Sequence, residues 1–250
     1  MTDDLLSLRV LFVSPAPADQ ELFRRAASAS RIPIEVIEAD GVASASRSFA
    51  VGVDIAFLDG WLGDDAIEKV TAAARAAAKP PFTVLMSGQS TKLPFSTDAL
   101  AIKPSGMGEA KSLVEKAVRL RLPSRVMVVD DSSTMRSIVR KILLATRFPL
   151  EVREVGQGSE ALELARQLEF DLIFLDYNMP GFTGLETMGE LRREKRNPAF
   201  VLITSLQDEA VARRARALGA AFLKKPFYLA DIEAVMCAYY GLRALNPQRA

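Results

Sequence analysis

Five residues in the second half of the chain have the types and spacing that phosphoryl-group chemistry needs. Each of them ends or directly follows a short apolar run: Asp130, Asp131, Asp176, Thr204 and Lys225. If those runs are parallel strands, their carboxyl ends meet at one edge of a sheet, where open α/β folds bind ligands. Three carboxylates at one place repel each other unless a cation joins them, and oxygen ligands suit Mg²⁺. A carboxylate could then attack phosphorus while metal and ammonium neutralise the developing charge.

The second half alternates short apolar runs with amphipathic segments. Residues 125–130 (RVMVVD) predict a buried strand, and residues 132–146 predict a helix with its apolar residues on one face. Four further pairs of the same kind follow, which makes five βα units. Continuous apolar strands between helices indicate a parallel sheet covered on both faces. The predicted fold class is therefore α/β, with the acids at the edge where the strands end.

The first half repeats this order of elements. The phrase FLDGWLGD matches FLDYNMPG, so that Asp59 lies 117 positions before Asp176. Self-similarity of this kind indicates a duplicated domain. We predict two tandem, doubly wound (βα)5 flavodoxin-like domains, each with a five-stranded parallel sheet, over residues 1–122 and 123–250.

The repeats differ in length at one place. Ser87 and Lys103 are 16 positions apart, whereas the matching Thr204 and Lys225 are 21 apart. The shorter segment contains Pro94 and several weak helix formers. We expect the fourth helix of the first domain to be shortened or lost. The apolar strand edge that this exposes, within about 88–121, must then be covered by the second domain or by a partner chain.

Composition narrows the function. The chain has no histidine, so histidine acid–base chemistry, His-ligated metals and a phosphohistidine of its own are excluded. With 32 basic and 31 acidic residues, nothing in the net charge points to nucleic acid or a membrane surface. No apolar run has the length of a membrane span, and the acidic start does not resemble a secretory signal. Cys237 is the only cysteine, which fits a reducing cytoplasm, and we expect it to be a buried helix residue.

Four phrases of the second half carry a family resemblance. VMVVDDSSTMRSIVRKIL, DLIFLDYNMPGFTGLE, VLITS and FLKKPF together resemble the receiver domain of two-component response regulators, above all the chemotaxis-type, single-domain ones. The resemblance covers about 123–243 and fills all five signature positions. It implies that Asp176 accepts a phosphoryl group from a histidine kinase or a histidine phosphotransfer protein. It also implies a phosphoacceptor with at most self-phosphorylation and self-dephosphorylation activity, and not an enzyme in the usual sense.

The resemblance also implies roles for the other residues of the site. Asp130 and Asp131 would bind Mg²⁺ together with Asp176 and the backbone carbonyl of Asn178. Lys225 would pair with the phosphoryl oxygens, with its bond to Pro226 in the cis form. The switch residues would be Thr204, which would bond the phosphoryl group, and the aromatic Phe222.

The first half resembles a degenerate receiver, or pseudo-receiver. Ser14 and Pro15 stand where the second half has its acid pair, while Asp59, Ser87 and Lys103 remain. One carboxylate without the acid pair makes a poor Mg²⁺ site, and we expect Asp59 and Lys103 to form a buried or half-buried ion pair. Other acids could substitute, although their spacing is not the family's: Asp19, Asp64 or Asp65. Leu100 matches the switch aromatic, and Trp61 is either an interface anchor or an ordinary packing residue.

Simpler interpretations of the same residues stay open. Asp130 and Asp131 could cap the following helix, and Asp176 could belong to a turn. A haloacid dehalogenase-like phosphohydrolase also uses a strand-end Asp with Mg²⁺, but it wants a second acid two positions on, where this chain has Asn178 and Trp61. A third alternative is a structural adaptor in which neither Asp is phosphorylated.

The output of such a protein would be contact with another protein. After the last predicted helix only GLRALNPQRA remains, which is too short for a DNA-binding or catalytic output module. We therefore expect protein–protein interaction, or removal of phosphoryl groups from a shared kinase. The kinase and the downstream target are not identified by the sequence, and a homodimer is left open.

Overall fold

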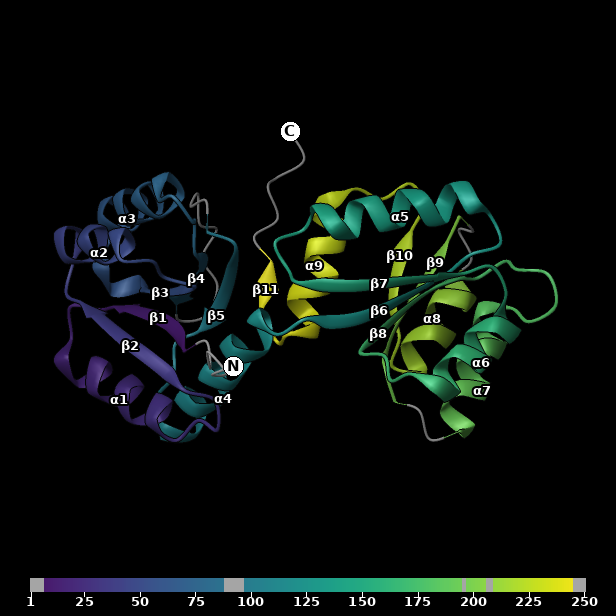
Figure 1. The fold of residues 1–250 in the computed structure, drawn as a ribbon, viewed down its shortest axis with the longest axis horizontal. Helices are drawn as coiled ribbons and strands as arrows, with labels where there is room; N and C mark the ends of the chain where they lie inside the picture. The colour runs from purple at the N-terminus through teal and green to yellow at the C-terminus, as the bar shows by residue number, and fades with distance from the viewer. Residues whose placement is uncertain (1–6, 88–96, 195–196, 206–208, 245–250) are drawn as a thin grey trace, which may run out of the picture. The chain divides into compact units, whose positions relative to one another are not determined.

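The computed structural model describes residues 7–87, 97–194, 197–205 and 209–244 (Figure 1). The chain forms two compact units. Unit 1 consists of Met1–Arg121 with Tyr240–Ala250, and unit 2 of Leu122–Tyr239. Within the described residues, no helix has both the length and the apolar character needed to cross a lipid bilayer.

Unit 1 is an α/β unit whose strands and helices alternate along the chain. Its elements are β1 (Leu8–Val13), α1 (Pro17–Ser28), β2 (Ile34–Ala39), α2 (Val42–Ala50), β3 (Ile55–Asp59), the short 3-10 helix η1 (Gly60–Leu62), α3 (Asp64–Ala76), β4 (Phe82–Ser87), β5 (Ala99–Ile102), α4 (Met107–Arg121) and β11 (Arg243–Ala244). The strand order is β11-β5-β4-β3-β1-β2, and β1 to β5 are parallel.

Unit 2 is also an α/β unit in which strands and helices alternate. Its elements are β6 (Ser124–Val129), α5 (Ser133–Ala145), β7 (Leu150–Val155), α6 (Gly158–Gln167), β8 (Leu172–Asp176), α7 (Gly184–Arg193), β9 (Ala199–Thr204), α8 (Glu209–Ala217), β10 (Ala221–Lys224) and α9 (Leu229–Tyr239). The order β10-β9-β8-β6-β7 is the flavodoxin-like order, with every neighbouring pair parallel.

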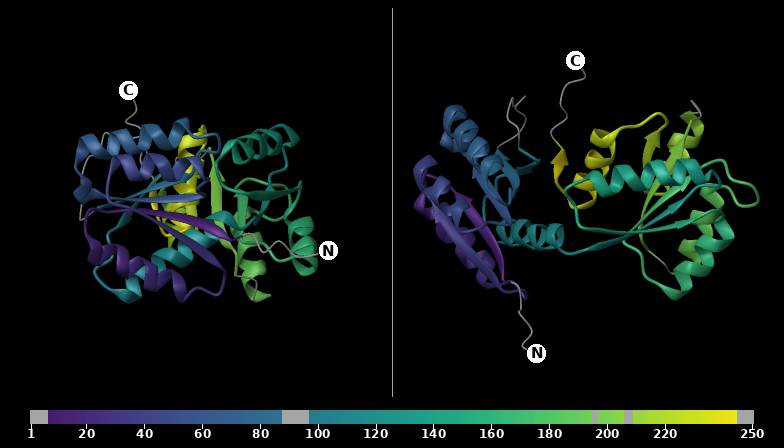
Figure 2. Two further views of the ribbon diagram at one scale, coloured as in Figure 1. Left: turned by 60° about the vertical axis from the view of Figure 1, so that its left-hand side comes forward. Right: turned by 45° about the horizontal axis from the view of Figure 1, so that its top comes forward.

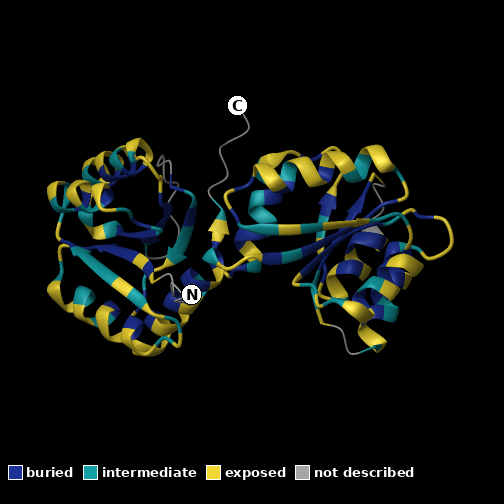
Figure 3. Cartoon of the chain, in the orientation of Figure 1, coloured by how far each residue is buried: buried dark blue, intermediate teal, exposed yellow. Residues whose placement is uncertain are grey.

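Helices cover both faces of each sheet (Figure 2). In unit 1, α1 packs beside α4 and α2 beside α3, while in unit 2 α5 packs beside α9 and α6 beside α7. The central strands IAFLD and LIFLD are buried along their whole length, as a strand covered on both faces must be. Figure 3 shows this contrast, with buried strands and helices whose outward faces are exposed.

The same backbone and polar contacts recur in the two units at the amino ends of the strands. In unit 1, Asp54 accepts a hydrogen bond from the Arg9 amide at 3.1 Å, and the Phe82 amide donates to the Asp54 carbonyl. In unit 2, Asp171 accepts from the Arg125 amide at 2.8 Å, and its carbonyl also accepts from the next strand. This repetition agrees with the duplicated order of elements predicted from the sequence.

The edge of the unit 1 sheet differs from the prediction. The sheet was expected to have five strands, but β11 pairs antiparallel with β5, with Arg243 opposite Leu100 and Ala244 opposite Ala99. Tyr240 and Leu242 of this segment are buried. The exposed strand edge is thus covered by residues that had been assigned to the second domain, so that the expected span 123–250 ends at Tyr239 in the structure. The expectation that the fourth helix of this unit is shortened or lost falls on residues 88–96, outside the described residues.

Candidate functional site

The chemical candidates of unit 2 lie at the carboxyl end of its sheet, on both sides of the point where the strand order reverses. Asp130 directly follows β6, and Asp176 is the last residue of its neighbour β8. The chain after β6 turns at once into α5, because the Ser132 hydroxyl caps that helix by accepting from the Met135 amide at 3.3 Å. The two acids therefore meet at the position where flavodoxin-like folds bind their ligands.

Lys225 joins the two acids. It follows β10, and its Nζ lies 2.6 Å from Asp176 Oδ1 and 3.1 Å from Asp130 Oδ2. Both carboxylates are almost fully buried, and the lysine is half-buried. Two negative charges and one positive charge are thus held together away from water.

Burial is the largest influence on the pKa of Asp176, and it raises that pKa. The charge of Asp130 raises it further, while the Lys225 hydrogen bond and charge and the Asn178 amide lower it, and the net shift is upward. Burial lowers the pKa of Lys225, but its bonds to the two carboxylates outweigh this and the net shift is upward. The carboxylate pair is therefore not fully neutralised by one ammonium group.

The other predicted residues of unit 2 are distributed as follows. Asp131 is exposed, while the Asn178 amide donates to Asp176 Oδ2 at 2.9 Å. Thr204 is buried at the end of β9, and its carbonyl accepts from the Lys225 amide. Phe222 is partly buried on β10 against the core of the unit. The Lys225–Pro226 bond is cis, as expected.

Unit 1 holds a different cluster at the same edge. Lys103 Nζ lies 2.8 Å from Asp59 Oδ2 and 2.7 Å from Asp19 Oδ2, so the expected ion pair between Asp59 and Lys103 is confirmed. The Ser14 hydroxyl donates to Asp59 Oδ2 at 2.7 Å, and the Trp61 amide donates to Oδ1 at 3.1 Å. Asp59 is fully buried and accepts bonds on both of its oxygens.

The pKa of Asp59 shifts in the opposite direction to that of Asp176. Burial raises it, but the hydrogen bonds from Lys103, Ser14 and the Trp61 amide, with the charge of Lys103, outweigh burial and lower it. One pair of matching positions contributes to this difference in pKa. Ser14 supplies a hydrogen-bond donor to Asp59 in unit 1, whereas Asp130 supplies a negative charge beside Asp176 in unit 2. Both clusters hold two carboxylates on one lysine, but the Ser14 hydroxyl and the Trp61 amide also donate to Asp59, whereas Asp176 keeps a raised pKa that a further cation would lower.

The remaining residues of the degenerate site are close by. Pro15 is exposed in the loop after β1, and Ser87 ends β4 with its carbonyl accepting from the Lys103 amide at 3.1 Å. Trp61 is 76% exposed, and Lys103 Nζ lies 4.1 Å from its ring centre. Its exposed ring contacts the cation of the cluster, so that ordinary core packing, one of the two interpretations above, does not describe it.

Three contributors to these sites were not identified as such from the sequence. Asp19 had been considered only as a substitute metal ligand, and it pairs with Lys103 instead. Arg136 and Gln20 each donate to the carbonyl of the residue that directly follows the first strand of their unit. Their equal spacing from Asp130 and Ser14, six positions in each unit, was available as a signal.

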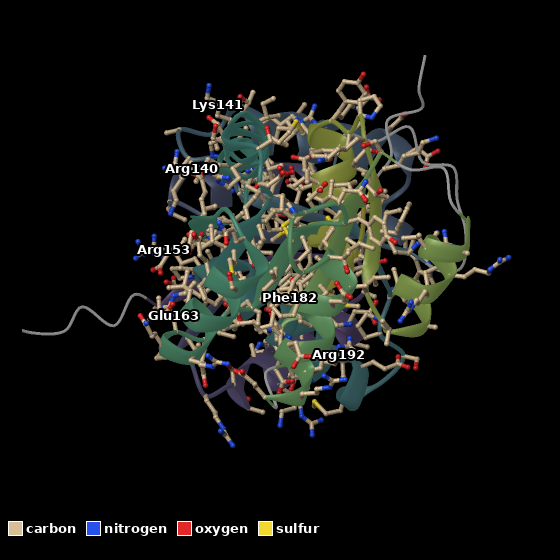
Figure 4. The ribbon with its side chains drawn as sticks, turned by 90° about the vertical axis from the view of Figure 1, so that its right-hand side faces the viewer. Arg140, Lys141, Arg153, Glu163, Phe182 and Arg192 are labelled. Carbon is tan, nitrogen blue, oxygen red and sulfur yellow. The ribbon has the colours of Figure 1, made fainter. Side chains whose placement is uncertain are left out.

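A glycine also shapes the site of unit 2. A side-chain carbon at Gly184, the first residue of α7, would lie 2.4 Å from the Asp176 carbonyl oxygen. The loop between them carries Phe182, which is labelled in Figure 4. Helix α7 can therefore begin this close to Asp176 only without a side chain at its start.

For the described residues, no group of three or more Asp, Glu or Cys side chains converges closely enough to form a metal centre by itself. The expected convergence of three carboxylates is thus reduced to two, Asp130 and Asp176, because Asp131 is exposed. One or two carboxylates, completed by waters and ligand oxygens, are a usual protein contribution to Mg²⁺. The oxygen donors and the incompletely neutralised charge of the pair fit such an ion.

Comparison with known proteins gives a consistent family. The model of the response regulator receiver domain matches residues 126–236. Chemotaxis protein CheY-3 of Vibrio cholerae is 30% identical over 112 residues, which cover 44% of this chain and 85% of that protein. The nitrate/nitrite response regulator protein NarP of Escherichia coli is 40% identical over 82 residues, which cover 33% of this chain and 38% of NarP. Transcriptional regulatory protein PdtaR of Mycobacterium tuberculosis is 33% identical over 112 residues, covering 44% of this chain and 54% of PdtaR. The chain thus spans only about a third to a half of the length of NarP and PdtaR.

One solved structure is similar to both units. A chain described as a two-component system response regulator/GGDEF domain protein aligns with a TM-score of 0.56 over 94% of this chain and 98% of its own, at 21% identity. At that identity the likeness shows the fold, two flavodoxin-like domains in tandem. The family itself is established by two other findings. The receiver-domain model matches within unit 2, and the chain covers 85% of CheY-3 at 30% identity. The chain therefore belongs to the response regulator receiver family of two-component signalling.

Proposed function

We propose that this protein is a phosphorelay response regulator in which unit 2 is the phosphoacceptor and unit 1 is a pseudo-receiver. The observation that carries the proposal is the opposite direction in which the pKa values of the two strand-end acids are shifted. Each lysine bridges two carboxylates, but Asp59 also accepts a hydrogen bond from the Ser14 hydroxyl and its pKa is lowered, whereas Asp176 has the negative charge of Asp130 beside it and its pKa is raised. The arrangement in unit 2 is the one that an additional cation would stabilise most.

The phosphoryl step forms one bond and breaks one bond. A carboxylate oxygen of Asp176 attacks phosphorus, and the bond from phosphorus to the donor nitrogen breaks. Because this chain has no histidine, the phosphohistidine belongs to another chain, a histidine kinase or a histidine phosphotransfer protein. Mg²⁺, when bound, would neutralise charge on the phosphoryl oxygens. Asp130 and Asp176 would hold it directly, together with the backbone carbonyl of Asn178, and the exposed Asp131 would complete the site only by moving toward the bound ion.

Other residues of the site would act on the phosphorylated form. Lys225 already contacts Asp176 and would exchange part of that contact for phosphoryl oxygens. The hydroxyl of Thr204 would bond the phosphoryl group, and Phe222 would change its packing as Thr204 moves. The output would be contact with a downstream protein or removal of phosphoryl groups from a shared kinase.

The test is covalent modification of the purified chain by a small phosphodonor. We expect one phosphoryl group per chain in the presence of Mg²⁺ and none in the presence of a metal chelator. Repeated turnover of a generic phosphate ester would instead support a haloacid dehalogenase-like hydrolase. Absence of both modification and Mg²⁺ binding would support a structural adaptor.

A further inference from the structure

We propose that Arg136 is a positioning residue, which holds the backbone at Asp130 so that the Asp130 carboxylate faces Asp176. Its role toward Mg²⁺ rests on the function proposed above, while its role toward the backbone does not. Arg136 lies in the first part of α5 and is partly buried. It touches neither Asp176 nor Lys225 in any hydrogen bond among the described residues, so it acts through Asp130.

The geometry is that of a clamp on the strand end. Arg136 Nη1 lies 2.6 Å from the carbonyl oxygen of Asp130 and 3.4 Å from that of Asp131. The Asp130 side chain is fixed at its other end, since Oδ1 accepts from the Ser132 amide at 2.9 Å and Oδ2 accepts from Lys225. Main chain and carboxylate are therefore held separately.

A donor is needed at this position for a general reason. The Asp130 amide still bonds across to Val155 at 3.4 Å, but the chain then turns out of the sheet into α5. A carbonyl at such a point no longer has its ladder partner, and an unpaired carbonyl beside a buried residue is costly. The Arg136 side chain supplies the missing donor from the helix.

Unit 1 contains the same clamp built from a different residue. Gln20 Nε2 donates to the Ser14 carbonyl at 2.9 Å and to the Ala39 carbonyl at 3.3 Å. Ser14 takes the place of Asp130 here as well, because the Ala16 amide donates to its Oγ at 3.2 Å as Ser132 donates to Asp130. The acid pair has been lost in this unit, yet the clamp remains.

The comparison separates geometry from charge. Gln20 carries no charge, so the element that the two units share is a side-chain N–H that reaches the strand-end carbonyl. We infer that holding this carbonyl is the essential contribution of Arg136, and that its positive charge is secondary. Arg136→Gln copies the arrangement of unit 1 and is the natural test of the distinction.

The experiment compares the parent chain with three variants of α5. Arg136→Met keeps the length of the side chain and removes its donors, and Arg136→Gln keeps a donor and removes the charge. Arg140→Met is the matched control, because Arg140 is exposed on the same helix and pairs with Glu154 at 3.3 Å (Figure 4). Amide exchange at Ser132 is measured without metal, and Mg²⁺ affinity is measured by calorimetry.

We expect Arg136→Met to speed exchange at Ser132 and to weaken Mg²⁺ binding by about tenfold or more, the usual effect of losing a residue that orients a ligand. Arg136→Gln should stay within about threefold of the parent chain in both measurements. Arg140→Met should behave like the parent chain. Unchanged exchange in Arg136→Met would overturn the proposal. A tenfold loss in Arg136→Gln as well would show that charge, not the clamp, is what matters.

Two outcomes have to be kept apart. If the parent chain binds no Mg²⁺, the proposed function fails, while exchange in the metal-free protein still decides whether the clamp exists. If Arg136→Met does not fold, Gln20→Met supplies the test in unit 1. That variant should speed exchange at the Ala16 amide, and an unchanged rate there would overturn the clamp.

Discussion

Ser14 and Asp130 occupy matching positions, and the difference between a hydroxyl and a carboxylate there reverses the electrostatics of each cluster. The hydroxyl donates to Asp59 at 2.7 Å and helps to lower its pKa. The carboxylate of Asp130 can only accept, and its charge helps to raise the pKa of Asp176. Each lysine bridges two carboxylates, so the hydroxyl or carboxylate at this one position helps to shift the pKa of the strand-end acid in opposite directions in the two units.

Asp130→Ser should therefore convert the second site toward the first. We expect the pKa of Asp176 to fall and Mg²⁺ affinity to drop by more than about tenfold, because a charge–charge interaction at this range is worth more than about 1.4 kcal/mol. Calorimetric titration with Mg²⁺ measures the change. Glu163→Ser, at an exposed position on α6 of the same unit, is the control. Equal affinity in the parent and in Asp130→Ser would mean that Asp130 is not a ligand.

The pH response of unit 1 can be followed through Trp61, the only tryptophan, which lies against Lys103. The pKa of Asp59 is lowered in the folded unit, so its contribution to stability is present above the unfolded-state pKa of about 3.9 and is lost as pH falls through the folded value. Ser14→Ala removes one of the bonds that lower this pKa. We expect the acid transition of Trp61 fluorescence to move up by about one pH unit.

The control for that shift is Ser46→Ala, in which the lost hydroxyl donates only to a carbonyl of its own helix. It should leave the acid transition where it is. A transition at the same pH in Ser14→Ala and in the parent chain would show that the hydroxyl does not stabilise the Asp59 carboxylate.

At the scale of secondary-structure elements, the approach of α7 to the end of β8 decides where Asp176 sits. The start of the helix is fixed by a capping box. The Thr183 amide donates to the Glu186 carboxylate, and the Glu186 amide donates to the Thr183 hydroxyl. The first residue of the helix, Gly184, lies against the Asp176 carbonyl and Leu202. The same helix contains Gly189, where an added side-chain carbon would meet no other atom within 4 Å.

The two glycines of α7 form a matched pair for an alanine substitution. We expect Gly184→Ala to destabilise unit 2 by about 1–3 kcal/mol, because the new carbon would overlap the backbone at 2.4 Å. Gly189→Ala should stabilise it by about 0.5–1 kcal/mol, since alanine is the better helix former and meets nothing there. Urea unfolding followed by circular dichroism measures both. Loss of stability in Gly189→Ala equal to that in Gly184→Ala would contradict the close approach.

At the scale of the whole chain, the boundary between units is crossed twice. The chain leaves unit 1 after Arg121, completes unit 2 at Tyr239 and returns to unit 1 with Tyr240. The returning segment buries Tyr240 and Leu242 and adds β11 to the edge of β5. An apolar edge strand is a site for unwanted pairing, and a strand from the same chain removes that risk.

We therefore expect the last segment to stabilise unit 1. Leu242→Ala should lower the free energy of unfolding of unit 1 by about 2–5 kcal/mol, the usual cost of truncating a buried leucine. Urea unfolding followed by Trp61 fluorescence reports unit 1 alone, because unit 2 contains no tryptophan. Arg243→Ala, at an exposed neighbouring position, should change it little. Identical unfolding of Leu242→Ala and the parent would mean that the segment contributes no stability.

The repeated strand order and the residues at strand ends could be predicted because periodicity and spacing record them directly. The apolar runs IAFLD and LIFLD predict buried strands, and the parallel order then brings Asp130, Asp176 and Lys225 together.

The position of Asp19 could not be predicted, since the family spacing does not contain it and only the fold brings α1 to Lys103. Strand β11 was missed for a similar reason. Two residues carry too weak a pattern to predict a strand, and the partner strand β5 lies about 140 positions earlier.

The central claim is that one of the two strand-end aspartates is chemical and the other is structural. It is tested most directly by mapping the phosphoryl group after incubation with Mg²⁺ and a small phosphodonor, in the parent chain, in Asp176→Asn and in Asp59→Asn. We expect a single modified residue, Asp176, with modification abolished in Asp176→Asn and retained in Asp59→Asn. Modification that persists in Asp176→Asn, or that is found on Asp59, would contradict the claim.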